Sequence, residues 1–230
     1  MNSQNNGNQE THENQIHQNH EENKDGETDM KLKDHQEQIQ YWVEIETRDL
    51  FDRAIEDGEN DCSFCSEDGY PLEFLFTFTN KLADKNMTVI TSLSLYDFKF
   101  TDEMVSVICR LHWLKSLYIF CNNITNISIK KISEELKELE DLNISYNEEV
   151  SDISPLKDLK HLKHLRAVGN KIKFICEDID YWLQLDYAAL HDHPFYDFQL
   201  RQLYWLEMKN NNLGHSKICS KLVEMLHPIQ

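Results

Sequence analysis

Several residue types are scarce in this 230-residue chain, and each scarcity excludes a class of protein. Six cysteines are too few for a disulfide scaffold, and no stretch comes near the roughly 20 apolar residues that a membrane-spanning helix needs. With only six glycines, the chain contains neither a G-x-x-x-x-G-K phosphate loop nor a G-x-S-x-G nucleophile elbow. We therefore expect a protein that is not an enzyme and that uses no cofactor.

Positive charge is scarce as well: 23 Lys and Arg stand against 41 Asp and Glu, which gives a formal net charge of −18. Nucleic acids and anionic membrane surfaces bind cationic faces, so neither is an expected partner. The chain starts without the basic and apolar segments of a signal peptide. We expect a soluble protein of a reducing compartment, the cytoplasm or the nucleus, and a protein partner that offers a basic segment.

Residues 1–40 are rich in Asn, Gln and acidic side chains and hold few apolar ones. Such a segment cannot bury enough apolar surface to offset its conformational entropy, so a disordered acidic tail is expected. Apolar residues then recur at helical spacing over residues 41–86, which predicts a helical N-terminal cap. Its first helix would follow a cap at Thr47 and its second would open at Pro71. An acidic loop, residues 56–69, would join them.

One motif, L-x-x-L-x-L-x-x-N-x-L, dominates the rest of the chain. Copies begin at Leu114, Leu139, Leu162 and Leu203, and their asparagines are Asn122, Asn147, Asn170 and Asn211. A weaker copy begins at Ile90 and has Phe98 in place of the asparagine. The steps from Ile90 to Leu162 are 24, 25 and 23 residues. A degenerate copy beginning at Trp182 would continue the array; otherwise residues 174–202 are an insertion.

On these residues the chain resembles the leucine-rich repeat family over residues 87–230. The phrases from Leu139 to Asn147 and from Val150 to Leu156 are similar to its short-repeat intracellular members, including phosphatase-regulating and dynein-associated proteins, and to bacterial internalins. The resemblance implies an α/β fold, a right-handed β-α superhelix in which in-phase asparagines bond backbone groups from coil to coil. Helical caps would close both ends of this solenoid, the C-terminal one around Leu222.

Alternate residues of each strand face away from the core, so the repeat also predicts which side chains line the concave face of the sheet. Large aromatic residues stand at several of these positions beside charged ones, which is the composition of protein-binding hot spots. The candidate partner-binding residues are Tyr96, Tyr118, Phe120, Asp141, Asn143, Arg166, Trp205 and Glu207. The alternative is that these aromatics lean on one another or are covered by tail or cap residues.

Two clusters suggest metal binding, but their spacing does not support it. Cys62 and Cys65 form a single C-x-x-C pair, whereas structural zinc requires a second pair or two histidines downstream. His191 and His193 lie beside Asp192, but the sequence places no third ligand. No metal site is therefore expected.

The favoured function is a non-enzymatic module that binds another protein on the concave face of a repeat arc. Two alternatives remain open. The segment from Pro71 to Leu75, with Phe78 and Leu82, faintly resembles the first helix of an F-box, which would imply a ubiquitin-ligase substrate receptor. The chain would otherwise be a structural subunit of a large assembly, and its oligomeric state is left open.

Overall fold

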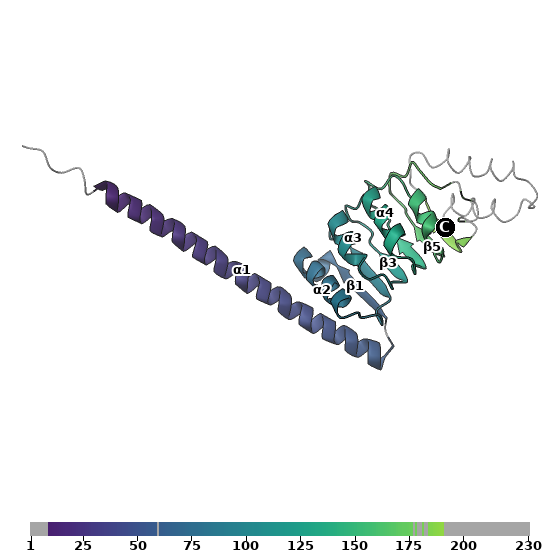
Figure 1. The fold of residues 1–230 in the computed structure, drawn as a ribbon, viewed down its shortest axis with the longest axis horizontal. Helices are drawn as coiled ribbons and strands as arrows, with labels where there is room; N and C mark the ends of the chain where they lie inside the picture. Colours follow the sequence, from purple (N-terminus) through teal and green to yellow (C-terminus); the bar gives the residue numbers. More distant parts are fainter. Residues whose placement is uncertain (1–8, 59, 177, 179–180, 182–183, 191–230) are drawn as a thin grey trace, which may run out of the picture. The chain divides into compact units, whose positions relative to one another are not determined.

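The computed structural model describes residues 9–58, 60–176, 178, 181 and 184–190 (Figure 1). The chain divides into two compact units, Met1–Glu46 and Thr47–Gln230. Among the described residues, no helix combines the length and the apolarity that crossing a bilayer demands. The repeat copy at Leu203 and the closing helix around Leu222 lie outside the described residues.

Helix α1, Gln9–Glu56, takes in most of the expected tail and the first expected cap helix. Burial along it begins at Ile39 and recurs at Val43, Thr47 and Leu50. The helix therefore does not begin at Thr47, because that side chain lies on the buried stripe well inside the helix. The side chains described before Ile39 are all exposed. A helix without a packed face is only marginally stable in water, which agrees with the acidic tail expected from composition.

The second unit is built on a sheet of parallel strands that pair in chain order. The described strands are β1 (Asp61–Cys65), β2 (Ser92–Tyr96), β3 (Ser116–Tyr118), β4 (Asp141–Asn143), β5 (His164–Arg166) and β6 (Tyr187–Ala189). Leucines of successive copies face each other across it, as in the pairs Leu93–Leu117 and Leu142–Leu165, and all four are fully buried. The α/β solenoid predicted from the repeat is therefore confirmed.

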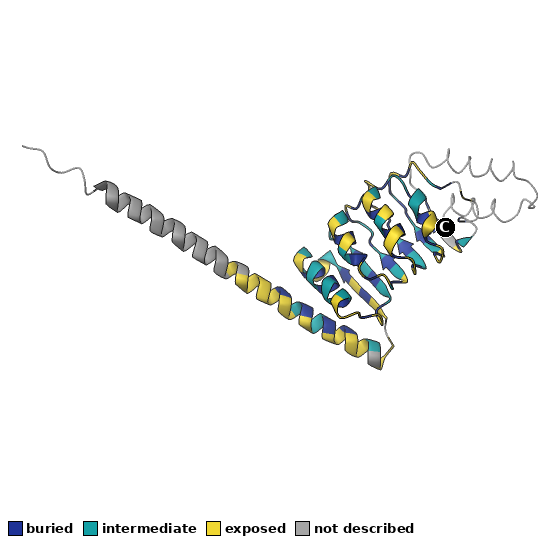
Figure 2. Ribbon diagram, viewed as in Figure 1, coloured by how far each residue is buried: buried dark blue, intermediate teal, exposed yellow. Residues whose placement is uncertain are grey.

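Helices cover one face of this sheet. Helices α2 (Leu72–Asp84), α3 (Asp102–Ile108) and α4 (Asn126–Glu135) connect strands β1 to β4, and the next connection is the 3-10 helix η2, Ser154–Asp158. Figure 1 shows α2, α3 and α4 side by side along the sheet, and Figure 2 shows buried residues on the strands and on the adjoining sides of these helices. The core therefore lies between the two layers, and the other face of the sheet is not covered by these helices.

Strand β1 occupies residues that the sequence pattern predicts to be an acidic loop. Cys62 and Phe64 are buried, Asp61 and Ser63 are exposed, and Cys65 is half-buried. Phe64 packs edge-on against Phe74 and Phe78 of α2, with ring centroids 5.3 and 5.1 Å apart. The sheet therefore starts before residue 87, and the prediction of a purely helical cap over residues 41–86 is wrong in this part.

Strand β6 decides between the two interpretations of residues 174–202. Ala188 pairs with Leu165 of β5 and lies between the buried Leu185 and Leu190. A degenerate copy is therefore present, but it begins at Leu185, three residues after the predicted start at Trp182. Its step from the start of the preceding copy is 23 residues, which restores the regular period. A search for leucines misses this copy, because Ala188 stands where the other copies have a leucine.

The in-phase asparagines form the backbone ladder that the repeat predicts. The side-chain amide of Asn147 donates to the carbonyl oxygens of Ile119 and Ile144 at 3.0 and 2.9 Å, and its Oδ1 accepts from the N–H of Ile124. Oδ1 of Asn170 in the next coil accepts from the N–H of Asn147 at 2.8 Å. These bonds join neighbouring coils just beyond the ends of the strands.

Candidate functional site

The solvent-facing side of the sheet carries residues in rows that run across the strands. Strand pairing aligns Ser92, Ser116, Asp141 and His164 in a first row, and Ser94, Tyr118, Asn143 and Arg166 in a second. Both rows have the order that the repeat predicts, and β1 extends them with Asp61 and Ser63. The register therefore brings four of the predicted binding residues onto three adjacent strands.

Asp141 is the centre of a polar network on this face. Its carboxylate accepts a hydrogen bond from Nη1 of Arg166 at 3.1 Å and lies 3.3 Å from Nδ1 of His164, both on the next strand. Only 15% of the Asp141 side chain is exposed. The Tyr118 hydroxyl on the preceding strand also bonds to Asp141, and the pKa of Tyr118 is raised by burial and then by the charge and hydrogen bond of Asp141. These side chains form one preorganised cluster across β3, β4 and β5.

Tyr96 is the last residue of β2, and Phe120 lies two residues after the end of β3. Their rings stack on each other. Their ring centroids are 4.9 Å apart and their planes are 7° from parallel, a separation close to the spacing of about 4.8 Å between neighbouring strands. Both side chains are half-buried. Part of the predicted alternative is therefore present, because these two aromatics lean on one another.

The other predicted residues differ in position. Oδ1 of Asn143 accepts from the N–H of Ser145 at 3.1 Å, so this side chain shapes the end of β4 and is a weaker candidate for partner contact. Trp205 and Glu207 lie outside the described residues, as do His191 and His193.

Comparison with known proteins agrees with this geometry. A family model described as leucine rich repeat matches residues 113–172, where the complete copies of the motif lie. Residues 113–172 are therefore leucine-rich repeats. Among solved structures, an internalin from Listeria monocytogenes is 26% identical, with a TM-score of 0.42; the match covers 53% of this chain and 38% of the internalin chain, well under two thirds of its length. A comparison with curated protein sequences finds no match.

In this solenoid, α2 is the helix of the first described coil. It is preceded by Pro71, as predicted, and the side chains of Phe74, Phe78 and Leu82 are fully buried. The apolar pattern that resembles an F-box helix therefore packs within the solenoid itself, and its apolar face is not presented to an adaptor protein.

Two acidic segments beside the aromatic stack are missed by the sequence pattern. Asp97 follows β2, and the 3-10 turn η1, Ser66–Asp68, follows β1. The hydroxyl of Ser66 donates to Oδ2 of Asp97 at 3.4 Å, and the N–H of Cys65 donates to Oδ2 of Asp68 at 2.7 Å. The signal that could have found them is the alternation of apolar residues in β1. Once β1 is recognised as a strand, parallel pairing places the residues after it next to those after β2.

The C-x-x-C pair of the repeat protein does not converge on a metal. Cys62 is buried in the core, whereas Cys65 stands three residues later on the other face of β1. Within the described part of the chain, no group of three or more His, Cys, Asp or Glu is arranged to hold a metal ion. Burial raises the pKa of Cys109 to about 12 and that of Cys176 to about 11, as expected of thiols that pack as small core residues.

Proposed function

We propose that this leucine-rich repeat protein binds another protein on the concave face of its sheet and carries out no chemistry of its own. The observation that carries the proposal is the cluster of Tyr118, Asp141 and Arg166, joined by hydrogen bonds on three adjacent strands. Tyrosine and arginine are enriched among the residues that dominate binding energy at interfaces. Because neighbours already hold these side chains, little conformational entropy is lost when a partner binds.

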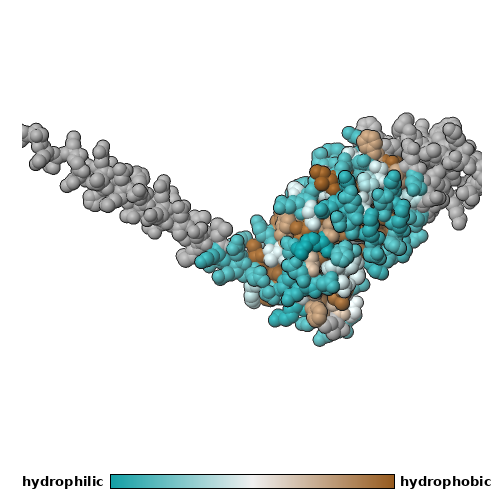
Figure 3. All heavy atoms as spheres, in the orientation of Figure 1, coloured by the Kyte–Doolittle hydropathy of each residue, from teal (hydrophilic) through white to brown (hydrophobic). Residues whose placement is uncertain are grey.

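The shape of the surrounding rows supports this use of the face. The serines Ser92, Ser94 and Ser116 line the part of the sheet next to the cluster and are half-buried. Small side chains let the backbone of a partner approach the sheet, while Tyr118 and Arg166 offer larger contacts beside them. The side of the molecule visible in Figure 3 is mostly hydrophilic with small separate hydrophobic patches.

The proposed partner offers a basic segment. Residues 61–190, which include the described sheet, contain 14 Lys and Arg and 21 Asp and Glu, a net charge of −7; residues 1–60 contain 5 and 16, a net charge of −11. Both parts attract a basic segment and increase its rate of association. Binding is therefore expected to weaken as salt screens these charges. The reducing cytoplasm or nucleus is the proposed setting.

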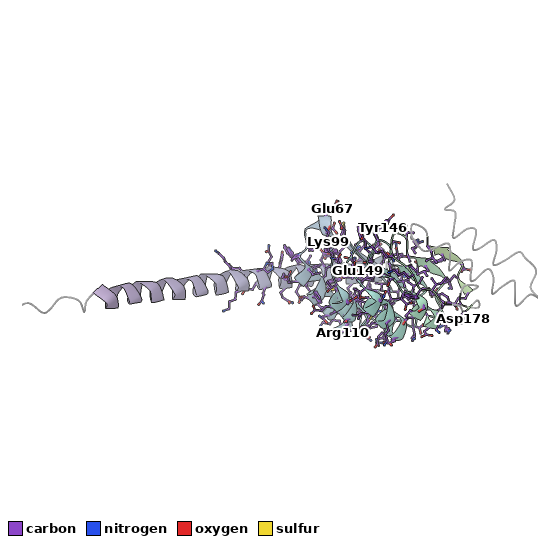
Figure 4. All side chains as sticks on the ribbon, turned by 90° about the horizontal axis from the view of Figure 1, so that it is seen from above. Glu67, Lys99, Arg110, Tyr146, Glu149 and Asp178 are labelled. Atoms are coloured by element: carbon purple, nitrogen blue, oxygen red, sulfur yellow. The ribbon has the colours of Figure 1, made fainter. Side chains whose placement is uncertain are left out.

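Affinity capture with the full chain tests the proposal. Wild type, Arg166→Ala and Arg110→Ala serve as baits, because Arg110 is an exposed arginine that pairs with Asp84 instead of the cluster. Figure 4 shows Arg110 on the opposite side of the solenoid from Glu67 and Lys99. A partner captured by wild type and by Arg110→Ala is purified and titrated against each variant. Arg166→Ala should bind it at least about tenfold more weakly, as loss of a hot-spot residue does.

Equal binding of the two arginine variants would exclude the concave cluster as the contact. Thermal unfolding of each bait separates lost binding from lost folding. If Arg166→Ala unfolds at markedly lower temperature, Tyr118→Phe provides a milder probe, because it removes only the hydroxyl that bonds to Asp141. This variant should also weaken the complex and leave the rest of the sheet intact.

A further inference from the structure

One face of the Tyr96 ring is directed toward strand β1. Tyr96 and Phe120 stand on neighbouring strands with nearly parallel planes, so the axis through the two rings runs across the strands. Phe120 covers one face of Tyr96, and the position next to the other face is Cys65, its register partner in β1. Because cysteine is small, the second face of the Tyr96 ring is not covered by a large side chain from that strand.

Carboxylates stand on the two loops that follow Cys65 and Tyr96. Asp97 directly follows Tyr96 and is tied to the η1 turn through the hydroxyl of Ser66. Asp68 in the same turn is held by the N–H of Cys65, and Glu67 is exposed beside it (Figure 4). One hydrogen bond, from Ser66 to Asp97, thus joins the two loops, and carboxylates follow both β1 and β2.

These carboxylates lack a cationic partner within the described part of the chain. Neither Asp97, Asp68 nor Glu67 forms an ion pair with a described residue, and their other bonds are to neutral donors. Lys99 is a nearby base in the chain, but its side chain is exposed and is paired with none of them. The pKa of Cys121 is raised by burial and, in addition, by the negative charge of Asp97. The region therefore combines an open aromatic face with negative charge that described residues do not neutralise.

We infer that Tyr96, Asp97 and Asp68 form a seat for one arginine side chain from the basic segment of the partner. The inference rests on the proposed function and names the chemistry of one contact within it. The guanidinium plane lies on the open face of the Tyr96 ring, whose quadrupole attracts a cation. Its N–H groups donate to the carboxylates of Asp97 and Asp68. Arginine fits this seat better than lysine, because its planar group stacks on a ring and donates sideways at the same time.

Nuclear magnetic resonance of the full chain tests the seat directly. The tyrosine rings are labelled with carbon-13, and the Tyr96 signal is identified by its loss in Tyr96→Phe. The probes are the peptide acetyl-Gly-Gly-Arg-Gly-Gly-amide and the same peptide with citrulline, a neutral side chain of nearly the same shape. The arginine peptide should shift the Tyr96 signal, and the citrulline peptide at the same concentration should leave it in place.

Matched variants assign the contribution of each group. Followed on the backbone amide signals of the η1 turn, which both variants keep, Asp97→Asn and Tyr96→Leu should each weaken binding of the arginine peptide about two- to fivefold, the change that about 0.5–1 kcal/mol produces at room temperature. Asp158→Asn is the control, because it removes an equal charge from an exposed position in η2 on the helical side of the sheet. It should change binding by less than about twofold, as expected for a distant charge screened by salt.

Three results would overturn the inference. Equal shifts with arginine and citrulline would show that the cation is irrelevant, and equal weakening by Asp97→Asn and Asp158→Asn would show attraction to net charge alone. A Tyr96 signal that the arginine peptide does not move would show that the seat is closed, for instance by a base of this chain itself. The proposed function has its own readout. A complex that is lost with Arg166→Ala but unaffected by Tyr96→Leu leaves that function standing and removes only the arginine seat.

Discussion

The ring of Tyr146 lies so close to the backbone of Gly169 in the next coil that a β-carbon at Gly169 would come within 2.5 Å of Cδ1 of the tyrosine. Both residues have a left-handed backbone, with φ of 57° and 66°. Each immediately precedes the ladder asparagine of its coil, and Cys121 has the same conformation one coil earlier. The turn that delivers each asparagine to the ladder therefore uses a conformation that glycine adopts without strain and other residues adopt at a cost.

Gly169→Ala is therefore expected to destabilise the solenoid. The left-handed backbone alone costs a residue with a β-carbon about 1–2 kcal/mol, and the contact with Tyr146 adds to it. Urea unfolding followed by circular dichroism gives the change in free energy. Adding Tyr146→Ala removes the contact but not the backbone cost, so the alanine at position 169 should be less harmful in that background. Equal effects in both backgrounds would contradict the contact between the two residues.

The asparagine ladder predicts unequal costs for two similar substitutions. Asn147→Ala removes bonds to Ile119, Ile144 and Ile124, and each buried group left without a partner costs about 1–3 kcal/mol. Asn122→Ala should cost less, because Oδ1 of Asn122 has no hydrogen-bond partner among the described residues. Denaturant unfolding of both variants checks the order. An Asn122→Ala protein less stable than Asn147→Ala would refute this account of the ladder.

Asp102 connects the starts of α3 and α4 and makes stability depend on acid pH. Burial alone would raise the pKa of its carboxyl, but hydrogen bonds from Ser128 and Thr125 outweigh burial and lower it below the ordinary 3.8. A lowered pKa means that the carboxylate stabilises the fold above the ordinary value, and that this contribution is lost as pH falls through the folded value. Wild type should be more stable than Asp102→Asn at neutral pH, and the difference should shrink below pH 3.8. Urea titrations at neutral and acid pH measure this difference in the free energy of unfolding. A difference that is the same at both pH values would contradict the prediction.

The raised pKa of Tyr118 predicts how the concave cluster titrates at alkaline pH. Burial first, and then the charge and hydrogen bond of Asp141, raise the pKa of its hydroxyl above the ordinary 10.0. The neutral phenol therefore stabilises the fold below that value, and the contribution is lost as pH rises through the folded pKa. Ultraviolet difference titration of wild type against Tyr118→Phe should reveal one tyrosine that ionises late. Asp141→Asn should move this ionisation to lower pH. If the ionisation does not move, Asp141 does not contribute to the raised pKa of Tyr118.

The central copies could be predicted in detail because each carries its full set of core residues. Leu117, Leu142 and Leu165 recur at nearly constant steps, and alternation along a strand then decides which neighbours face solvent. Strand β1 could not be predicted, because Cys62 and Phe64 replace the leucines inside an acidic stretch. The starting residue of the copy that contains β6 could not be predicted for a related reason. Ala188 occupies a core position that holds leucine in the other copies.

The sequence by itself determined that this chain forms a leucine-rich repeat solenoid and which side chains belong to its concave face, because period and alternation are local properties. Tertiary structure alone decided that Asp141 bonds to Arg166, that Tyr96 stacks on Phe120 and that Asp97 meets the turn after β1. These partners are 24 to 31 residues apart, in coils joined by helices of different length. Their contacts depend on how neighbouring coils align in space, and no local pattern records that alignment.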